Sequence, residues 1–209
     1  MPRDKKNLVE EIEREIAESE ACRLGAGKIP VFAYGNPDTG VMIVGEGPGR
    51  EEESLQRPFV GRAGQLLRRA LSDLGLDLDR DFFVTNIVRY RSLRVTKDGR
   101  RLNAPPSATQ VEGCRPFLER EIDVIKPRLI ITLGVNAAKW FLGKGFNLTE
   151  GRGWVYEWRG IKLLPTYHPA SALRPFGVAG AERKRRFEKD LAKAAYMIRE
   201  SPKDYRIAT

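Results

Sequence analysis

The chain has 209 residues, of which 41% are hydrophobic and 31% charged, as in an ordinary water-soluble globular protein. This length allows one full domain, because domains usually contain roughly 100–200 residues. No apolar run reaches the ~18–20 residues of a membrane span, and the charged segment 1–20 predicts that there is no signal peptide. Without such a span we expect no membrane partner. Two cysteines are too few for a disulfide framework, so we also expect a cytoplasmic protein.

Positive charge is in excess and unevenly distributed. The chain has 37 Lys and Arg against 28 Asp and Glu, a net charge of +9, and a second basic block lies at residues 183–186. The bases of the basic segment 89–103 are Arg89, Arg91, Arg94, Lys97, Arg100 and Arg101, against the single acid Asp98. Clustered cations suit a phosphate backbone, because each neutralised phosphate releases counterions. The charge therefore predicts a nucleic-acid partner, with a generally basic surface as the alternative.

Short apolar runs alternate with helical patterns along the chain, which predicts an α/β fold with a mainly parallel sheet. The expected helices are Leu8–Glu18, Ala63–Leu74, Ala108–Ile125, Asn136–Leu142 and Ala181–Arg199. The expected strands are Val41–Val44, Phe83–Val88, Leu129–Leu133 and Ile161–Leu164. The polar, basic segment Ser92–Pro106 has no hydrophobic period, so we expect a loop. We therefore expect a single domain over residues 1–209, a three-layer α/β/α sandwich with a four-stranded sheet.

Four notable segments follow or end the four expected strands. They are Gly45–Gly49, Thr85–Asn86, Gly134 and Thr166–Pro169. Because ligands of open α/β sheets gather beyond the carboxyl ends of the strands, we expect these segments to meet at one site. Gly45–Gly49 is neither a dinucleotide fingerprint nor a P-loop, since it lacks the third glycine and the Gly-Lys-Ser/Thr ending. A tight strand-to-helix turn is the alternative interpretation.

Three side chains near these segments have the chemistry to recognise a base. The ring of Phe59, just before an expected helix, can stack on a base, although a core position is the alternative. The amide of Asn86 matches the O4 and N3–H edge of uracil or another lactam, unless the backbone satisfies it. His168 is the only histidine, which excludes an all-histidine metal site, and a lone histidine is more often structural.

Taken in order, the segments resemble the family-4 uracil-DNA glycosylases from about Cys22 to Leu191. The motifs that carry the resemblance are GEGPG-x-x-E (45–52), RPFVG-x-AG-x-LL (57–67), TN-x-V-x-x-R (85–91), C-x-PFLE (114–119), LGVNAA (133–138) and TYHP-x-x-x-LR (166–174). The resemblance implies an α/β/α enzyme that flips uracil out of DNA and hydrolyses its N-glycosidic bond, which starts base excision repair. It also implies that no metal takes part in the chemistry.

The resemblance implies a role for each candidate residue. Phe59 would stack on the flipped uracil, and Asn86 would bind its Watson–Crick edge. His168 would donate, as a neutral ring, to uracil O2, where negative charge develops. The backbone of Glu46 and Gly47 would line the pocket. The catalytic carboxylate that places the attacking water would be Glu46 or Glu52, a choice that the sequence leaves open.

The implied partner is uracil-containing DNA, single- or double-stranded, bound by a monomer. Segment Ala170–Arg174 would form the loop that enters the duplex, so we expect Arg174 to contact DNA. The other expected DNA contacts are Arg94, Lys97, Arg100 and Arg101. Two alternatives remain: a glycosylase for another deaminated base, hypoxanthine or xanthine, and a lesion-binding paralogue that does not cleave.

The cysteines depart from the family pattern. Four cysteines usually bind a [4Fe–4S] cluster in the family, and only Cys22 and Cys114 occupy two of those places here. Ser19 and Tyr90 occupy the other two, and neither is a good cluster ligand. We therefore expect no cofactor and no metal: either the cluster is lost and Tyr90 fills the vacated volume, or the chain belongs to a divergent branch of the family.

Overall fold

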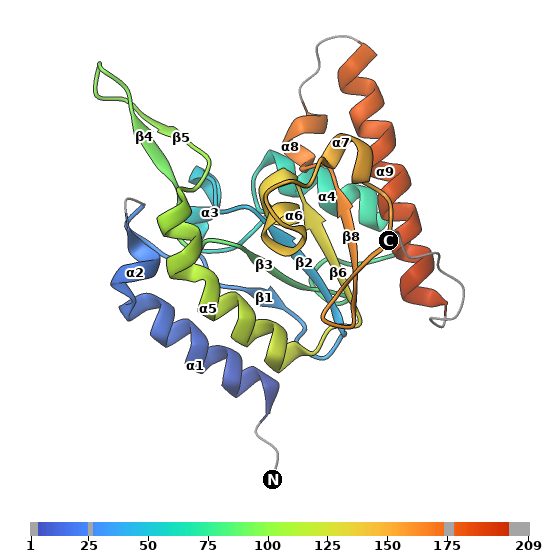
Figure 1. The fold of residues 1–209 in the computed structure, drawn as a ribbon, viewed down its shortest axis with the longest axis horizontal. Coiled ribbons are helices and arrows are strands. Elements are labelled where there is room, and N and C mark those ends of the chain that lie inside the picture. Colours follow the sequence, from blue (N-terminus) through green and yellow to red (C-terminus); the bar gives the residue numbers. More distant parts are fainter. Residues whose placement is uncertain (1–3, 25–26, 174–177, 201–209) are drawn as a thin grey trace.

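A six-stranded sheet forms the middle layer of the computed structural model, which describes residues 4–24, 27–173 and 178–200 (Figure 1). In spatial order the strands are β1 (Tyr34–Gly35), β3 (Phe83–Asn86), β2 (Val41–Gly45), β6 (Leu129–Leu133), β8 (Ile161–Thr166) and β7 (Tyr156–Trp158). The four expected strands are parallel neighbours, and β1 and β7 add antiparallel edges. The expected strand number was wrong because these edge strands are two and three residues long and partly exposed, so they carry no apolar pattern.

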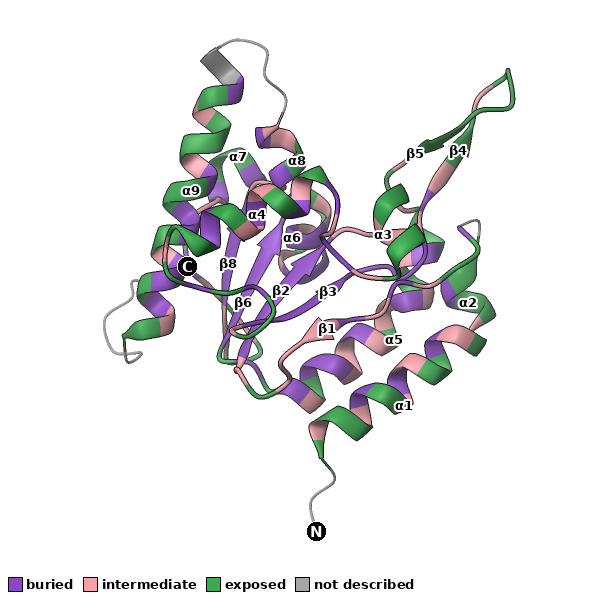
Figure 2. Cartoon of the chain, turned by 180° about the vertical axis from the view of Figure 1, so that it is seen from behind, coloured by how far each residue is buried: buried purple, intermediate pink, exposed green. Residues whose placement is uncertain are grey.

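Helices cover both faces of the sheet. On one face lie α1 (Lys5–Glu18), α2 (Glu20–Arg23), α5 (Ala108–Ile125) and α6 (Val135–Leu142), and on the other α4 (Arg62–Ser72) and α9 (Val178–Arg199). Short helices α3 (Arg50–Leu55), α7 (Leu148–Gly151) and α8 (Pro169–Ala172) lie in the connections. Alternate residues of β2 face opposite layers, Met42 with α1 and α5, Ile43 with α4 and α9. The central strands are therefore buried on both faces (Figure 2), which confirms the three-layer prediction.

Every expected helix and strand is present, with ends that shift by a few residues. The shift that matters for function is in β3, which ends at Asn86 instead of continuing to Val88. Asn86 is therefore the last residue of its strand, at the carboxyl edge of the sheet. Within the described ranges, no helix is long and apolar enough to cross a membrane.

The segment Ser92–Pro106 contains a β-hairpin, so the expectation of a loop was wrong. Strands β4 (Leu93–Val95) and β5 (Arg101–Asn103) pair antiparallel and extend away from the sheet in both views (Figures 1 and 2). Apart from Leu93, every residue of the two strands is exposed. No core selects one face of the hairpin, which is why the sequence shows no alternating hydrophobic pattern.

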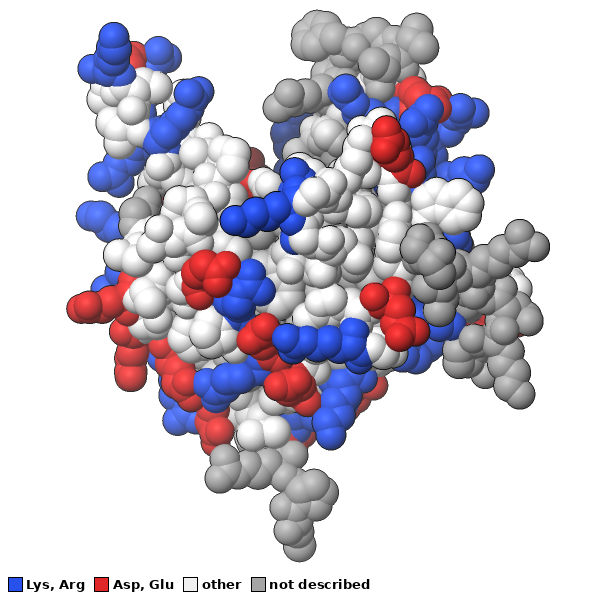
Figure 3. Space-filling view, viewed as in Figure 1, with Lys and Arg blue, Asp and Glu red and all other residues white. Residues whose placement is uncertain are grey.

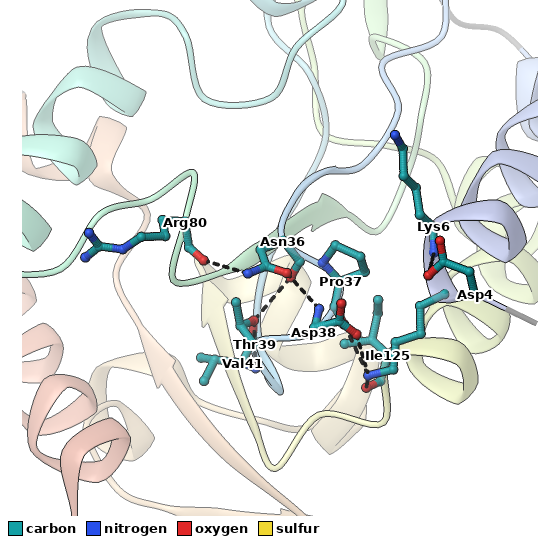
Figure 4. Close-up of polar contacts among 10 residues, drawn as sticks. Asp4, Lys6, Asn36, Pro37, Asp38, Thr39, Val41, Arg80 and Ile125 are labelled. Atoms are coloured by element: carbon teal, nitrogen blue, oxygen red, sulfur yellow. Dashed lines mark hydrogen bonds and ion pairs between the residues drawn. The ribbon is translucent and has the colours of Figure 1, made fainter. Parts of the chain in front are cut away.

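Polar contacts connect the segments at the amino end of the sheet, and Figure 4 shows these contacts. The side chain of Asn36, in the turn before β2, donates to the carbonyl oxygen of Arg80 over 3.2 Å. The ammonium of Lys5 donates to the carbonyl oxygens of Pro37 and Ile125, over 3.2 and 3.0 Å. Helix α1 is thereby fixed to the turn before β2 and to the end of α5. The chain's glycine-rich loops lie at the opposite end.

Candidate active site

A cavity of about 570 Å³ opens at the carboxyl ends of the central strands. The loop that follows β2 lines it, together with Asn86 at the end of β3 and His168 after β8, and Phe59 adds a further wall. Gly134, after β6, lies directly behind His168, because a Cβ on this glycine would be 3.1 Å from the histidine Cβ. The four segments expected at one site therefore do converge.

Gly45 allows Asn86 and Phe59 to approach each other. A Cβ at this glycine would lie 2.3 Å from Asn86 Oδ1 and 2.6 Å from Phe59 Cζ, so a larger residue would displace both side chains. Phe59 has a positive φ of 54°, which a bulky residue rarely adopts and which often marks a functional constraint. The fold thus holds an aromatic ring and an amide against the same point of β2.

The amide of Asn86 carries two hydrogen-bond donors and one acceptor group on a single side chain. The residue is 3% exposed, and its side chain makes no hydrogen bond to another described residue. The amide atoms are not among the fully buried, unpaired polar atoms of the described residues, so they are accessible from the cavity, where a ligand with a complementary polar edge can bind them.

His168 precedes α8, and a backbone hydrogen bond fixes its ring. The N–H of Ala170 donates to Nδ1 over 3.2 Å, so a neutral ring carries its proton on Nε2. Burial lowers the pKa of His168 to about 4, with the nearby charge of Glu52 opposing this shift. At neutral pH the ring is an uncharged donor, and its centroid lies 6.2 Å from that of Phe59.

The two candidate carboxylates are held differently. Both oxygens of Glu52 accept backbone N–H groups, from Gly61 over 2.9 Å and from Gly49 over 3.2 Å, so this residue joins the two glycine loops. Glu46 accepts a 2.9 Å bond at Oε2 from Asn136 Nδ2, and its Oε1 has no hydrogen-bond partner among the described residues. Burial raises the pKa of Glu46 and the bond from Asn136 opposes the rise. Glu46 therefore lines the cavity with one oxygen available to a ligand or water.

The sequence reading did not identify Asn136 as part of the site. This residue is the second of α6, in the turn of helix that follows β6. Its place two residues after Gly134, one of the four convergent segments, was the available signal.

The expected DNA contacts lie apart from the pocket side chains. Arg94, Lys97, Arg100 and Arg101 are exposed on the β4–β5 hairpin, where Arg100 pairs with Asp98 at 2.6 Å. The base of the hairpin reaches the site, because Ser92 and the segment 103–106 line the cavity. Arg174, and with it the end of the expected DNA-entering loop, lies outside the described residues.

Arg89 does not belong to the cationic surface. Although it was counted in the basic segment, its side chain is 1% exposed and pairs with Glu121 at 2.7 Å. The second basic block is partly neutralised, since Glu182 pairs with Arg185 and Arg186 and Glu188 pairs with Lys184. The free cationic surface is therefore smaller than the sequence suggests.

The residues in the four cluster-ligand places do not fit an iron–sulfur cluster. Cys22 and Cys114 are joined in a disulfide, so neither offers a thiolate to a cluster. Ser19 Oγ accepts from the N–H of Cys22 over 3.2 Å and caps α2, and buried Tyr90 donates to the carbonyl oxygen of Ile16 over 3.4 Å. In the described part of the chain, no three His, Cys, Asp or Glu side chains are grouped to hold a metal ion.

Comparison with known proteins identifies the family. The sequence profile of the uracil DNA glycosylase superfamily matches residues 32–192, well over half of the chain. The chain belongs to this superfamily.

Several curated type-4 uracil-DNA glycosylases are similar to this superfamily member. It is 40% identical to the one from Pyrobaculum aerophilum, over 79% of this chain and 81% of the relative. It is 37% identical to the one from Sulfurisphaera tokodaii, over 79% and 76%. The solved structure of wild-type SMUG2 from Pedobacter heparinus shares the fold, with a TM-score of 0.51 at 10% identity over 89% of this chain and 97% of that chain.

Proposed function

We propose that this protein is a uracil-DNA glycosylase that flips uracil out of DNA and hydrolyses its N-glycosidic bond, which starts base excision repair. The observation that carries the proposal is the unpartnered amide of Asn86, set beside the ring of Phe59 and facing a cavity with a neutral His168. Flipped bases are read by hydrogen bonds to their Watson–Crick edge and by stacking on aromatic rings. Superfamily membership supports the same substrate.

His168 supports cleavage of the bond. When the C1′–N1 bond breaks, its electron pair moves into the uracil ring, and negative charge develops on O2. The Nε2–H of His168 donates to this oxygen, and its low pKa makes it a hydrogen-bond donor without proton transfer. A donor already fixed by the Ala170 N–H needs no reorganisation as the charge appears.

Glu46 supports the attack by water on the sugar. Its open Oε1 accepts a hydrogen bond from the water, while Asn136 fixes Oε2. The water oxygen bonds to C1′ of the oxocarbenium-like sugar and gives a proton to Glu46, which leaves an abasic site. Uracil leaves as an anion and takes up a proton from solvent after its release. Glu52 takes a supporting role in this scheme, because both of its oxygens hold backbone N–H groups.

DNA would cross the molecule between two basic projections. In Figure 3, Lys and Arg side chains gather on the β4–β5 hairpin and on the N-terminal half of α9, with a notch between them. Arg94, Lys97, Arg100 and Arg101 bind backbone phosphates in this arrangement. The proposal extends to Arg174, and to single- and double-stranded DNA as partners.

We further infer that the enzyme works without a cluster. The Cys22–Cys114 disulfide and Tyr90 occupy the ligand places and support this view. That the enzyme is a cytoplasmic monomer with a single domain over residues 1–209 stays a prediction.

The test is one incubation of the purified protein with matched oligonucleotides that contain uracil, hypoxanthine, xanthine or no lesion, followed by alkaline cleavage of abasic sites. Cleavage at uracil alone is the expected result, and a His168→Ala preparation made in parallel controls for a contaminating glycosylase. Cleavage mainly at hypoxanthine or xanthine would assign the pocket to another deaminated base. Selective binding of uracil DNA without any cleavage would identify a lesion-binding paralogue.

A further inference from the structure

A buried network ties the end of β3 to α5, directly behind the base-binding residue. Glu121 of α5 accepts at Oε2 from the hydroxyl of Thr85 over 2.9 Å and from Arg89 Nη2 over 2.7 Å. The other terminal nitrogen of Arg89, Nη1, donates to the carbonyl oxygen of Asn86. One carboxylate thus holds the residue before Asn86 through a hydroxyl, and Asn86 itself through an arginine.

The pair is poorly suited to a purely stabilising role. The side chains of Arg89 and Glu121 are 1% and 0% exposed, so both charges lose their hydration. Arg89 Nε and Glu121 Oε1 are buried without a hydrogen-bond partner among the described residues. Buried ion pairs that leave polar atoms unpaired contribute little net stability, and apolar replacements of similar volume are often neutral or stabilising.

The ion pair of Arg89 and Glu121 fixes the backbone where β3 ends. Asn86 pairs with Gly45 in the last rung of the parallel ladder, and the chain then leaves the sheet. Arg89 bonds back to the carbonyl three residues earlier, so its side chain closes the turn that follows the strand. The turn begins at Asn86, whose side chain lines the cavity.

A similar network at the end of β8 provides a comparison. Asp190 of α9 accepts at Oδ2 from the hydroxyl of Thr166 over 2.6 Å and from Arg152 Nε over 2.8 Å. This second carboxylate is also buried, but it lies on the other face of the sheet and makes no bond to Asn86. Asp190 therefore makes the same kinds of hydrogen bond as Glu121, but at the end of a different strand and on the opposite face of the sheet.

We propose that Arg89 and Glu121 are positioning residues for base recognition: they hold the end of β3 so that the Asn86 amide meets the Watson–Crick edge of the flipped base. The inference rests on the proposed glycosylase function. Neither residue touches the substrate, and both act through Asn86.

A double-mutant cycle tests this route. Glu121→Gln keeps the size of the side chain and removes its charge, and we expect it to slow single-turnover uracil excision about tenfold. In an Asn86→Ala background the same change should cost less than about twofold, because the amide that it positions is gone. Equal fold losses in both backgrounds would overturn the proposal. Asp190→Asn is the matched control, and its effect should be the same in both backgrounds.

A second variant separates positioning from stability. Arg89→Met combined with Glu121→Leu replaces the ion pair by apolar groups of similar volume but leaves the Thr85 hydroxyl and the Asn86 carbonyl oxygen without these partners, so the thermal melting point should change little. Excision should nevertheless remain about tenfold slower than in the parent. A stable double variant with the parent's excision rate would overturn the proposal, even if Glu121→Gln failed to fold.

A readout without activity distinguishes this inference from the proposed function. The side-chain amide signals of Asn86, assigned by their loss in Asn86→Ala, should shift in the Arg89→Met/Glu121→Leu protein and stay in place in Asp190→Asn. If the parent were inactive on uracil while these signals moved as expected, the proposed function would fail and the positioning link would stand. Unmoved signals would overturn the link itself.

Discussion

The pocket and the β4–β5 hairpin hold their functional side chains in opposite ways. In the pocket, Phe59, Asn86 and His168 are uncharged at neutral pH and are fixed by strand ends, glycine contacts and backbone bonds. On the hairpin, four cations extend from a ribbon that is exposed on both faces. The pocket should therefore set the rate of bond cleavage, and the hairpin should set the affinity for DNA. Each prediction below changes one region and asks whether the other property stays the same.

The largest effect should follow loss of the His168 ring. His168→Ala should slow single-turnover uracil excision by about 10²–10³-fold, because it removes a preorganised donor to the developing charge. Affinity for uracil-containing DNA should change much less. A loss of affinity as large as the loss of rate would contradict the assignment.

The protonation of His168 gives a pH prediction. Since it is the only histidine, its imidazole signals are unambiguous in a nuclear magnetic resonance titration, and they should give a pKa of about 4 with the proton on Nε2 at pH 7. Because the folded pKa lies below the unfolded value of about 6.5, the unfolded chain binds more protons between these pH values. The free energy of unfolding should therefore fall as the pH drops through this window, and His168→Gln should remove that part of the fall. A folded pKa near 6.5 would exclude the neutral-donor role at mildly acidic pH.

Next in size is the difference between the two carboxylates. Glu46→Gln should slow excision by about 10²-fold, since it removes the group that orients and deprotonates water, and should leave the melting temperature nearly unchanged. Glu52→Gln should instead lower the melting temperature, because it weakens the caps at Gly49 and Gly61. The reverse pattern would move the catalytic role to Glu52.

Loss of the aromatic wall should have a smaller effect. Phe59→Ala should weaken binding of the flipped base by about 1–3 kcal/mol and slow excision accordingly, because stacking is lost. Phe59→Tyr keeps the ring and serves as the control. A Phe59→Ala enzyme as fast as the parent would mean that the ring is only a core residue.

Loss of the disulfide should lower the stability of the fold and leave the rate of uracil excision nearly unchanged. Reduction of Cys22–Cys114 should lower the free energy of unfolding by about 2–4 kcal/mol, because the bond closes a loop that spans 92 residues. Excision by the folded enzyme should be nearly unchanged, because neither cysteine lines the cavity. A Cys22→Ser/Cys114→Ser variant, which has no disulfide, should not respond to reductant.

Anaerobically purified protein should also be colourless, and stoichiometric iron and sulfide would refute the inference that no cluster binds.

The smallest effect on rate should come from the hairpin. Replacing Arg94, Lys97, Arg100 and Arg101 with Ser should lower DNA affinity and flatten its salt dependence by up to about one unit of slope per lost phosphate contact. An unchanged salt slope would show that the hairpin does not meet DNA, and would place the DNA contacts at Arg174 and residues 183–186.

The two regions also differ in how far the sequence predicts them. The layers and the convergence of Asn86 and His168 were predictable, because continuous apolar runs mark the central strands and the site residues end or follow those strands. The hairpin was not, because strands exposed on both faces carry no hydrophobic pattern. The burial of Arg89 could not be predicted from the sequence either, because its counterion Glu121 lies 32 residues further along the chain. The Cys22–Cys114 disulfide was not predicted either, because two cysteines without a secretory segment indicated a reducing compartment.

The most direct test of the division between pocket and hairpin is a single-turnover measurement of uracil excision at saturating protein, made on three proteins side by side. The parent and the hairpin variant with four serines should excise uracil at nearly the same rate, because saturation removes the difference in affinity. Asn86→Ala should be at least about tenfold slower than both, because it has lost the amide that holds the base. An Asn86→Ala rate equal to that of the parent, or a hairpin variant that is the slowest of the three, would contradict the account.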